Sequence, residues 1–511
     1  SGYLQRFGTV GEASSKNHAL FVQDSYQIAR RLTLNLGVRF ENENVPNFGA
    51  AGTTAIKFGW GSKVSPRIGG SFDLLGNGKT KVFASWGWFY DRFKYELPRG
   101  SFGGDFYRRD YFEILPERGA AYTNYTRGAI IGSTTDPIGG SCPGPNAPVW
   151  PGGWSICQFD FRIATNIAGA DIFESGAVDP NLKAARQSEY TFGVEHQLAA
   201  NTLIAGRYTH KNVDRAIEDV GVINGQGSEA YIIANPGYGL VCTVAASGGT
   251  PCPKAQRKYD AVEVRLDRRT AKYFFNASYT WSRLFGNYSG LASSDEAGRS
   301  SPNVNRFFDL PPLGFNANGV PDNGLLATDR THVFKAYGGY SFDWAGNGIN
   351  KTTVSAFTTV ESGTPLTTIY NLYNLGTAIL NGRGDLGRTP MFTETDFSVS
   401  HRYKFGRDAR FTFEPYVDIR NLFDEKNVLG VDTTISTANI TASQLAANGC
   451  TTCGSEQATF YTIFHGGILT YVNNYISNPA TSLASQRRNT YGLANSYQAP
   501  RDVRFGFRFY F

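Results

Sequence analysis

The sequence predicts an all-β fold, a transmembrane antiparallel β-barrel, on three observations. Apolar and polar residues alternate with a period of two over many segments, as in strands with one apolar and one polar face. The connections between these segments are alternately short and long. Aromatic residues make up 14% of the 511 residues, Gly numbers 58 and Met occurs once, so the composition favours strands and loops over helices.

The alternation is clearest at residues 502–511, where every second residue is apolar and Arg504 and Arg508 lie between them. About thirteen strands are expected, most of them ten residues or longer. They lie near 17–28, 32–41, 63–74, 80–91, 187–198, 202–213, 262–267, 273–282, 331–342, 351–361, 395–405, 411–420 and 502–511. Soluble strands average about 5–6 residues and tilted membrane strands about 9–11, so these lengths favour membrane spans. Trp86, Trp88 and Trp281 near strand ends suit an interfacial aromatic girdle.

The connections support the same fold. Short ones are expected near 29–31, 76–79, 199–201, 269–271, 343–350 and 406–409, and long ones near 46–62, 92–186, 214–257, 286–328, 363–391 and 425–500. Outer-membrane barrels have short periplasmic turns and long extracellular loops, whereas such long loops are unusual in a compact soluble domain. Residues 1–511 are therefore interpreted as one barrel segment, with its main extracellular loops at about 92–186, 214–257, 286–328 and 425–500.

Composition excludes other classes of protein. The net charge of +6 is small for this length, which argues against a dedicated nucleic-acid binder. The mean hydropathy is −0.30. No run approaches the roughly 18–20 apolar residues that a spanning helix needs. Residues 1–6 show no signal peptide, so either a targeting signal has been removed or the chain is part of a longer one.

The polar face of the predicted strands carries full charges. If the alternation is interpreted correctly, these residues project away from lipid: Arg39, Glu41, Glu195, Glu263, Arg265, Asp267, Arg402, Lys404, Glu414, Asp418, Arg420, Arg504 and Arg508. Charged groups are costly in a dry core, so this face is expected to meet water or a polar plug. The functional interpretation is a hydrated lumen that holds a plug or passes a solute; the alternative is that these residues only solvate the wall and pair with each other.

Several segments, in order along nearly the whole chain, carry a resemblance to a known family. They are 18–26 (HALFVQDSY), 31–41 (RLTLNLGVRFE), 88–92 (WFYDR), 277–282 (ASYTWS), 329–334 (DRTHVF), 381–390 (NGRGDLGRTP), 421–424 (NLFD) and 504–511 (RFGFRFYF). With these segments the chain resembles the C-terminal barrel of TonB-dependent outer-membrane receptors, most closely the Oar-like branch.

The resemblance implies a bacterial outer-membrane location and about the last 13 of 22 barrel strands, with the plug domain outside this chain. It implies uptake of an unidentified solute, coupled to the TonB complex through the plug. Implied partners are outer-membrane lipid, the upstream strands and plug of the same protein, and the assembly machinery, which would recognise the strand carrying Phe505, Phe507, Phe509 and Phe511. The rival hypothesis is a structural or adhesive barrel that holds a surface partner protein. No nucleic acid is expected.

The six cysteines form three local pairs in loop-like stretches: Cys142 with Cys157, Cys242 with Cys252, and Cys450 with Cys453. Local disulfides in outward loops are expected because the compartment is oxidising, with free thiols as the alternative.

The other motifs in the sequence do not predict a catalytic or ligand-binding site. Residues 382–387 match G-x-G-x-x-G, but Pro390 and a strand follow instead of a helix, so a glycine-rich loop is the interpretation, and the Arg383-Gly384-Asp385 tripeptide is assigned to chance. Cys450 and Cys453 lack a second ligand pair, with His465 as a lone candidate. No catalytic, cofactor-binding or metal site is predicted, and the protein is not expected to be an enzyme.

Overall fold

The computed structural model describes residues 2–9, 14–46, 54–93, 105–116, 125–133, 177–223, 229–243, 252–288, 290, 322–372, 376–379, 382–435, 442–447, 451 and 488–511. Its main feature is a 14-stranded sheet, in which β15 (Gly324–Leu325) pairs with β14 off the main path. The other thirteen strands are hydrogen-bonded in sequence order, and every pairing on the path is antiparallel. Within the described residues no pairing joins the two edge strands of this path.

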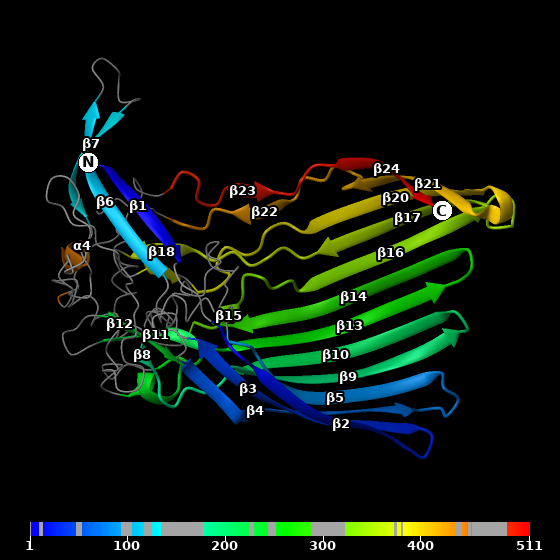
Figure 1. The fold of residues 1–511 in the computed structure, drawn as a ribbon, viewed down its shortest axis with the longest axis horizontal. Coiled ribbons are helices and arrows are strands. Elements are labelled where there is room, and N and C mark those ends of the chain that lie inside the picture. Colours follow the sequence, from blue (N-terminus) through cyan, green and yellow to red (C-terminus); the bar gives the residue numbers. More distant parts are fainter. Residues whose placement is uncertain are drawn as a thin grey trace.

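The thirteen strands lie where the alternation predicts them (Figure 1). They are β2 (His18–Ile28), β3 (Leu32–Pro46), β4 (Thr54–Asp73), β5 (Thr80–Tyr90), β9 (Arg186–Ala199), β10 (Thr202–Arg215), β13 (Arg257–Arg269), β14 (Tyr273–Gly286), β16 (His332–Asp343), β17 (Asn350–Glu361), β20 (Phe392–Phe405), β21 (Phe411–Arg420) and β24 (Asp502–Tyr510). One expectation is wrong: the loop placed at 46–62 is mostly strand, because β4 begins at Thr54. Ile56, Phe58 and Trp60 continue the period of two there.

The six connections predicted to be short lie at one end of the sheet, here called the turn end; the other is the loop end (Figure 1). Two of the turns share the sequence D-x-x-G-N-G, at 73–78 and 343–348. The Asp73 carboxylate accepts hydrogen bonds from the backbone N–H of Gly76 and Gly78 at 2.9 and 2.8 Å, and Asp343 accepts one from Gly348 at 2.8 Å. Gly78 and Gly348 have φ of 74° and 71°, a left-handed conformation that favours glycine.

The loop end carries smaller elements that the sequence did not predict. They are β1 (Gly2–Thr9), β6 (Asp105–Pro116), β7 (Tyr125–Ser133), β8 (Ala177–Val178), β11 (Glu218–Ile223), β12 (Glu229–Ala234), β18 (Ile369–Leu372), β19 (Gly376–Ile379), β22 (Val428–Val431), β23 (Ala494–Tyr497), the short helix α4 (Ala442–Ala447) and the 3-10 helix η1 (Gly239–Cys242). A further 3-10 helix, η4 (Arg407–Ala409), forms a turn between β20 and β21. Among the described residues, no helix is long and apolar enough to cross a bilayer.

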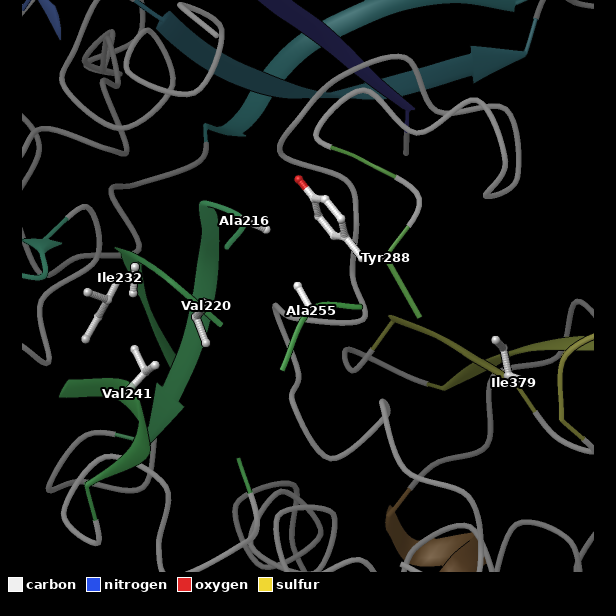
Figure 2. Packing of buried hydrophobic residues seen from close by; sticks show 8 residues of the cluster. Ala216, Val220, Ile232, Val241, Ala255, Tyr288 and Ile379 are labelled. Atoms are coloured by element: carbon white, nitrogen blue, oxygen red, sulfur yellow. The ribbon is translucent and has the colours of Figure 1, made fainter. Parts of the chain in front are cut away.

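Buried apolar side chains gather at the loop end instead of along the main sheet. One cluster contains Ala216, Val220, Ile232, Ala234, Val241, Ala255, Tyr288 and Ile379 (Figure 2). A second contains Val45, Ile56, Phe58, Phe93, Ala184, Ile217 and Ile233. By contrast, large apolar side chains of the main sheet are exposed, for example Phe192 at 60% and Phe505 at 78%. A sheet whose apolar face is exposed along its length, with buried apolar clusters only at one end, fits a membrane wall.

Candidate functional site

The strand register places all thirteen predicted charged residues on one face of the sheet. Directly paired residues of antiparallel strands project to the same side, and alternate residues project to opposite sides. Glu414 pairs with Arg508, and Asp418 with Arg504. Arg265 pairs with Ser278, and Glu195 pairs with Lys81. Extending these pairings strand by strand gives one charged face, while the opposite, apolar face carries Phe505, Phe507 and Phe509.

Ion pairs between neighbouring strands neutralise much of the charged face. Lys81 contacts Glu195 at 2.7 Å and Arg207 contacts Glu263 at 3.0 Å. Pairs two residues apart on one strand add to this: Arg39 with Glu41, Arg265 with Asp267, and Arg504 with Asp502. Asp418 accepts a hydrogen bond from Ser398 at 2.6 Å. Each exposed pair contributes only about 0.2–1 kcal/mol, so this arrangement suits a hydrated wall better than a dry core.

Among the thirteen predicted charged residues, Glu414 is the most enclosed, with a side chain only 6% exposed. It accepts hydrogen bonds from Arg402 at 2.8 Å and Arg508 at 2.9 Å, which connect β20, β21 and β24. The Arg508 guanidinium also lies over the Tyr416 ring, 4.5 Å from its centroid. Two arginines on one carboxylate fix the last three strands relative to each other.

A buried ion pair at the loop end was not predicted from the sequence. Lys63 and Glu43 join β4 to β3, with side chains 1% and 3% exposed. Glu43 also accepts the backbone N–H of Phe93 at 2.9 Å, and Lys63 donates to the Asp91 carbonyl at 2.8 Å. Lys63 lies at a polar position of the alternation on its strand, so the sequence gives no sign that its ammonium lies over the Phe58 ring of the second apolar cluster, 5.3 Å from the centroid.

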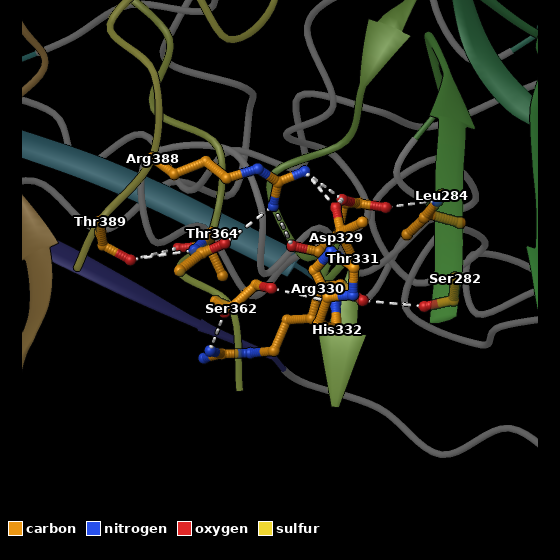
Figure 3. Close-up of polar contacts among 11 residues, drawn as sticks. Ser282, Leu284, Asp329, Arg330, Thr331, His332, Ser362, Thr364, Arg388 and Thr389 are labelled. Carbon is orange, nitrogen blue, oxygen red and sulfur yellow. Dashed lines mark hydrogen bonds and ion pairs between the residues drawn. The ribbon is translucent and has the colours of Figure 1, made fainter. Parts of the chain in front are cut away.

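Two segments of the family resemblance meet at the loop end of β14, β16 and β17 (Figure 3). Arg388 of the 381–390 segment forms an ion pair with Asp329 of the 329–334 segment, whose side chain is fully buried. Arg388 also donates to the Gly363 carbonyl at 2.8 Å, to Thr331 Oγ1 at 2.9 Å and to the Asp329 carbonyl at 3.1 Å. Asp329 in turn accepts the backbone N–H of Leu284. Here this contact is called the Arg388 clamp.

The glycine-rich segment that contains this arginine has no nucleotide-binding geometry. Residues 383–386 form a turn, and the backbone continues to β20 without a helix. Asp385 accepts the backbone N–H of Thr368 at 2.7 Å, and Arg383 donates to the carbonyls of Asp322 and Asn287, both at 3.2 Å. The charged residues of the Arg383-Gly384-Asp385 tripeptide are thus engaged within the fold.

The segment at 421–424 holds the loop ends of β20, β21 and β24 together. Asn421 is buried and has a φ of 49°. Its amide nitrogen donates to the carbonyls of Glu425 and Ala499 at 2.9 and 3.0 Å, and its own backbone N–H donates to Asp396 at 3.0 Å. The resemblance segments at 329–334, 381–390 and 421–424 are therefore architectural.

Cys242 and Cys252 form a disulfide beside the first apolar cluster, with their Cα atoms 5.4 Å apart. The pairs Cys142 with Cys157 and Cys450 with Cys453 lie outside the described residues, as does His465.

Two histidines on predicted strands have ordinary partners. His196 lies 2.7 Å from Thr80 Oγ1, and His332 lies 2.7 Å from the Tyr279 hydroxyl. Within the described ranges, no group of three or more His, Cys, Asp or Glu side chains could hold a metal ion.

A cavity of about 710 Å³ opens on the charged face at the loop end of β5, β9, β10, β13 and β14. Phe89, Gln187, Lys211, Val213 and Tyr259 line it, and the register places all five on the charged face. Its size falls in the range of small-molecule sites, about 300–1,000 Å³.

Exposed apolar strands, a charged opposite face and short turns at one end define the class of outer-membrane β-barrel proteins. Residues 3–387 match the family described as outer membrane beta barrel domain, and the chain belongs to this family. It is therefore a protein of the bacterial outer membrane. The chain is 30% identical over 530 residues to the TonB-dependent transporter Oar of Myxococcus xanthus, which confirms the predicted resemblance. The alignment covers 99% of this chain and 44% of that transporter, so the chain spans less than half the length of its relative.

Solved structures of outer-membrane receptors show low similarity scores. The outer membrane transporter YddB of Escherichia coli is 12% identical with a TM-score of 0.45, covering 83% of this chain and 43% of YddB. The ferripyoverdine receptor of Pseudomonas aeruginosa, bound to ferripyoverdine, is 12% identical with a TM-score of 0.40, covering 82% and 36% of the two chains. The relatives named here are transporters and receptors.

Proposed function

We propose that this chain forms part of the wall of a TonB-coupled transporter that takes up a solute across the outer membrane. The observation that carries the proposal is the charged face: a continuous set of paired ions opposite a lipid-compatible face suits a water-filled passage. The similarity to a TonB-dependent transporter supplies the mode of energy coupling.

In this proposal the thirteen charged residues line the lumen and contact a plug that belongs to the same protein. The loop end lies outside the cell, so the segments 92–186, 214–257, 286–328 and 425–500 are extracellular and receive the solute. The turn end lies in the periplasm, where TonB pulls on the plug. The edge strand β2 pairs with upstream strands, because unpaired backbone groups in lipid cost several kcal/mol each.

We also propose that β24 acts in assembly. Phe505, Phe507 and Phe511 are 78%, 72% and 89% exposed. With Phe509 they form an aromatic row along the apolar face that ends at the turn end. Aromatic side chains favour the membrane interface, and such a row offers the assembly machinery a surface to bind.

Solute depletion tests the transport proposal while the solute itself is still unidentified. Cells with the full-length protein, cells lacking it and cells lacking TonB are grown in one medium, and the spent media are compared by mass spectrometry. We expect at least one compound to be depleted only when both the protein and TonB are present. Equal depletion in all three strains, together with loss of a surface protein from the strain lacking this protein, would favour the scaffold hypothesis instead.

A further inference from the structure

We infer that the cavity at the loop end of β5, β9, β10, β13 and β14 binds an organic anion, a carboxylate or phosphate carried on an aromatic or similarly apolar body. The inference deepens the proposed function, because this cavity would be an outer binding station for the transported solute.

Charge is the first argument. Four cationic side chains line the cavity, Arg186, Lys211, Arg215 and Arg257, against one carboxylate, Asp91. Arg186 contacts Asp214 at 2.9 Å and Lys211 contacts Glu189 at 3.1 Å, both from neighbouring strands, and Arg257 also has a partner. The lining is therefore more basic than the rest of the charged face, where carboxylates and cations alternate.

Arg215 is the second argument. In the described part of the chain, no ion pair engages its guanidinium, and its buried Nε has no hydrogen-bond partner. An unsatisfied buried donor on a charged group is costly, so a guanidinium in this state favours binding of an acceptor oxygen. A carboxylate or phosphate oxygen satisfies a guanidinium in the forked geometry that arginine favours.

The aromatic walls are the third argument. Phe89, Tyr259 and Tyr288 line the same cavity. Arg67 lies over the Phe89 ring at 4.7 Å from its centroid, and Tyr288 belongs to the first apolar cluster (Figure 2). Aromatic walls beside a few polar groups are the composition of sites that bind small organic molecules, whereas a simple inorganic ion would leave these rings unused.

The test uses the full-length protein purified from outer membranes in detergent and three small probes of similar shape. Benzoate carries a carboxylate, phenyl phosphate carries a phosphate, and benzamide is the neutral counterpart of benzoate. Binding is measured by saturation-transfer NMR and calorimetry. We expect benzoate or phenyl phosphate to bind at least tenfold more tightly than benzamide, and the preference between the two anions identifies the ligand's anionic group.

Arg215→Gln should weaken anion binding at least tenfold. Arg407→Gln, which removes the same charge at the turn end, away from the cavity, should leave it unchanged. Raising the ionic strength provides a test on the wild-type protein: it should weaken binding of benzoate or phenyl phosphate but not binding of benzamide. Benzamide binding as tightly as the anions, no binding by any probe, or wild-type affinity in Arg215→Gln would overturn the inference. Anion binding without TonB-dependent solute depletion would contradict the transport proposal alone, and depletion without anion binding would contradict this inference alone.

Discussion

Arg388→Ala is expected to have a large local effect at the loop end. The wild-type Arg388 clamp ties Asp329, Thr331 and Gly363 together across the loop ends of β14, β16 and β17 (Figure 3). The Asp329 side chain is fully buried, so removing its cation leaves a buried carboxylate that, among the described residues, is held by Leu284 N–H and Thr331.

The magnitude follows from the burial of the two partners. Breaking a buried ion pair by removing one side costs about 3–5 kcal/mol. The Arg388 side chain is 26% exposed, so water compensates part of this loss, and we expect about 2–4 kcal/mol. Because every 1.4 kcal/mol is a factor of ten, local opening should become about 30- to 700-fold more frequent.

Hydrogen exchange followed by mass spectrometry measures this opening. In the full-length protein in detergent, peptides containing the Leu284 amide should exchange faster in Arg388→Ala, while turn-end peptides keep the wild-type rate. Arg504→Ala is the matched control: its ion pair with Asp502 is 59% and 45% exposed and should matter little. Combining Arg388→Ala with Asp329→Asn should restore part of the protection of the Leu284 amide from exchange, because the unpaired Asp329 carboxylate charge is removed. Unchanged exchange at Leu284 in Arg388→Ala would refute the assigned role of the clamp.

Three further predictions concern other parts of the molecule. Burial raises the pKa of the Asp322 carboxyl, with Arg383 opposing the shift. Its stabilising contribution is therefore complete below the unfolded pKa and is lost as the pH rises through the folded pKa, so Asp322→Asn should protect the loop end from proteolysis at neutral pH but not in acid. Equal protection at both pH values would contradict this. Gly348→Ala places a Cβ at a φ of 71° and should lower the free energy of unfolding, measured by denaturant titration, by about 1–2 kcal/mol. Gly61→Ala on β4 is its control, because the added Cβ also meets open space there but the backbone is not left-handed; equal costs in the two variants would exclude backbone strain as the cause. Phe511→Ala should lower the amount of folded, heat-modifiable protein in the outer membrane without changing solute depletion per folded molecule; normal amounts with lost depletion would place Phe511 in transport instead.

The sequence predicts the main sheet well because a membrane wall obeys one simple rule. Every strand must present apolar residues to lipid and polar residues to water, so the period of two identifies both the strands and their faces. The turns at the turn end are also specified by local sequence: an Asp at the strand end and glycines in the turn, as in 73–78, determine the connection. The extension of β4 was missed although Ile56, Phe58 and Trp60 alternate, because Gly59 and Gly61 on either side of Trp60 suggest a loop.

The loop end could not be predicted in the same way, because its contacts join residues that are distant in sequence. In the sequence Lys63 and Glu43 resemble other polar strand residues, although in the fold they are buried beside Phe58 and Phe93 of the second apolar cluster. Arg388 and Asp329 are 59 positions apart, and neither of their segments has a pattern that identifies its partner. The same holds for the cavity, whose lining comes from five strands. In this fold the lipid determines the local pattern, whereas the contacts at the loop end are non-local, and no such periodicity constrains the sequence there.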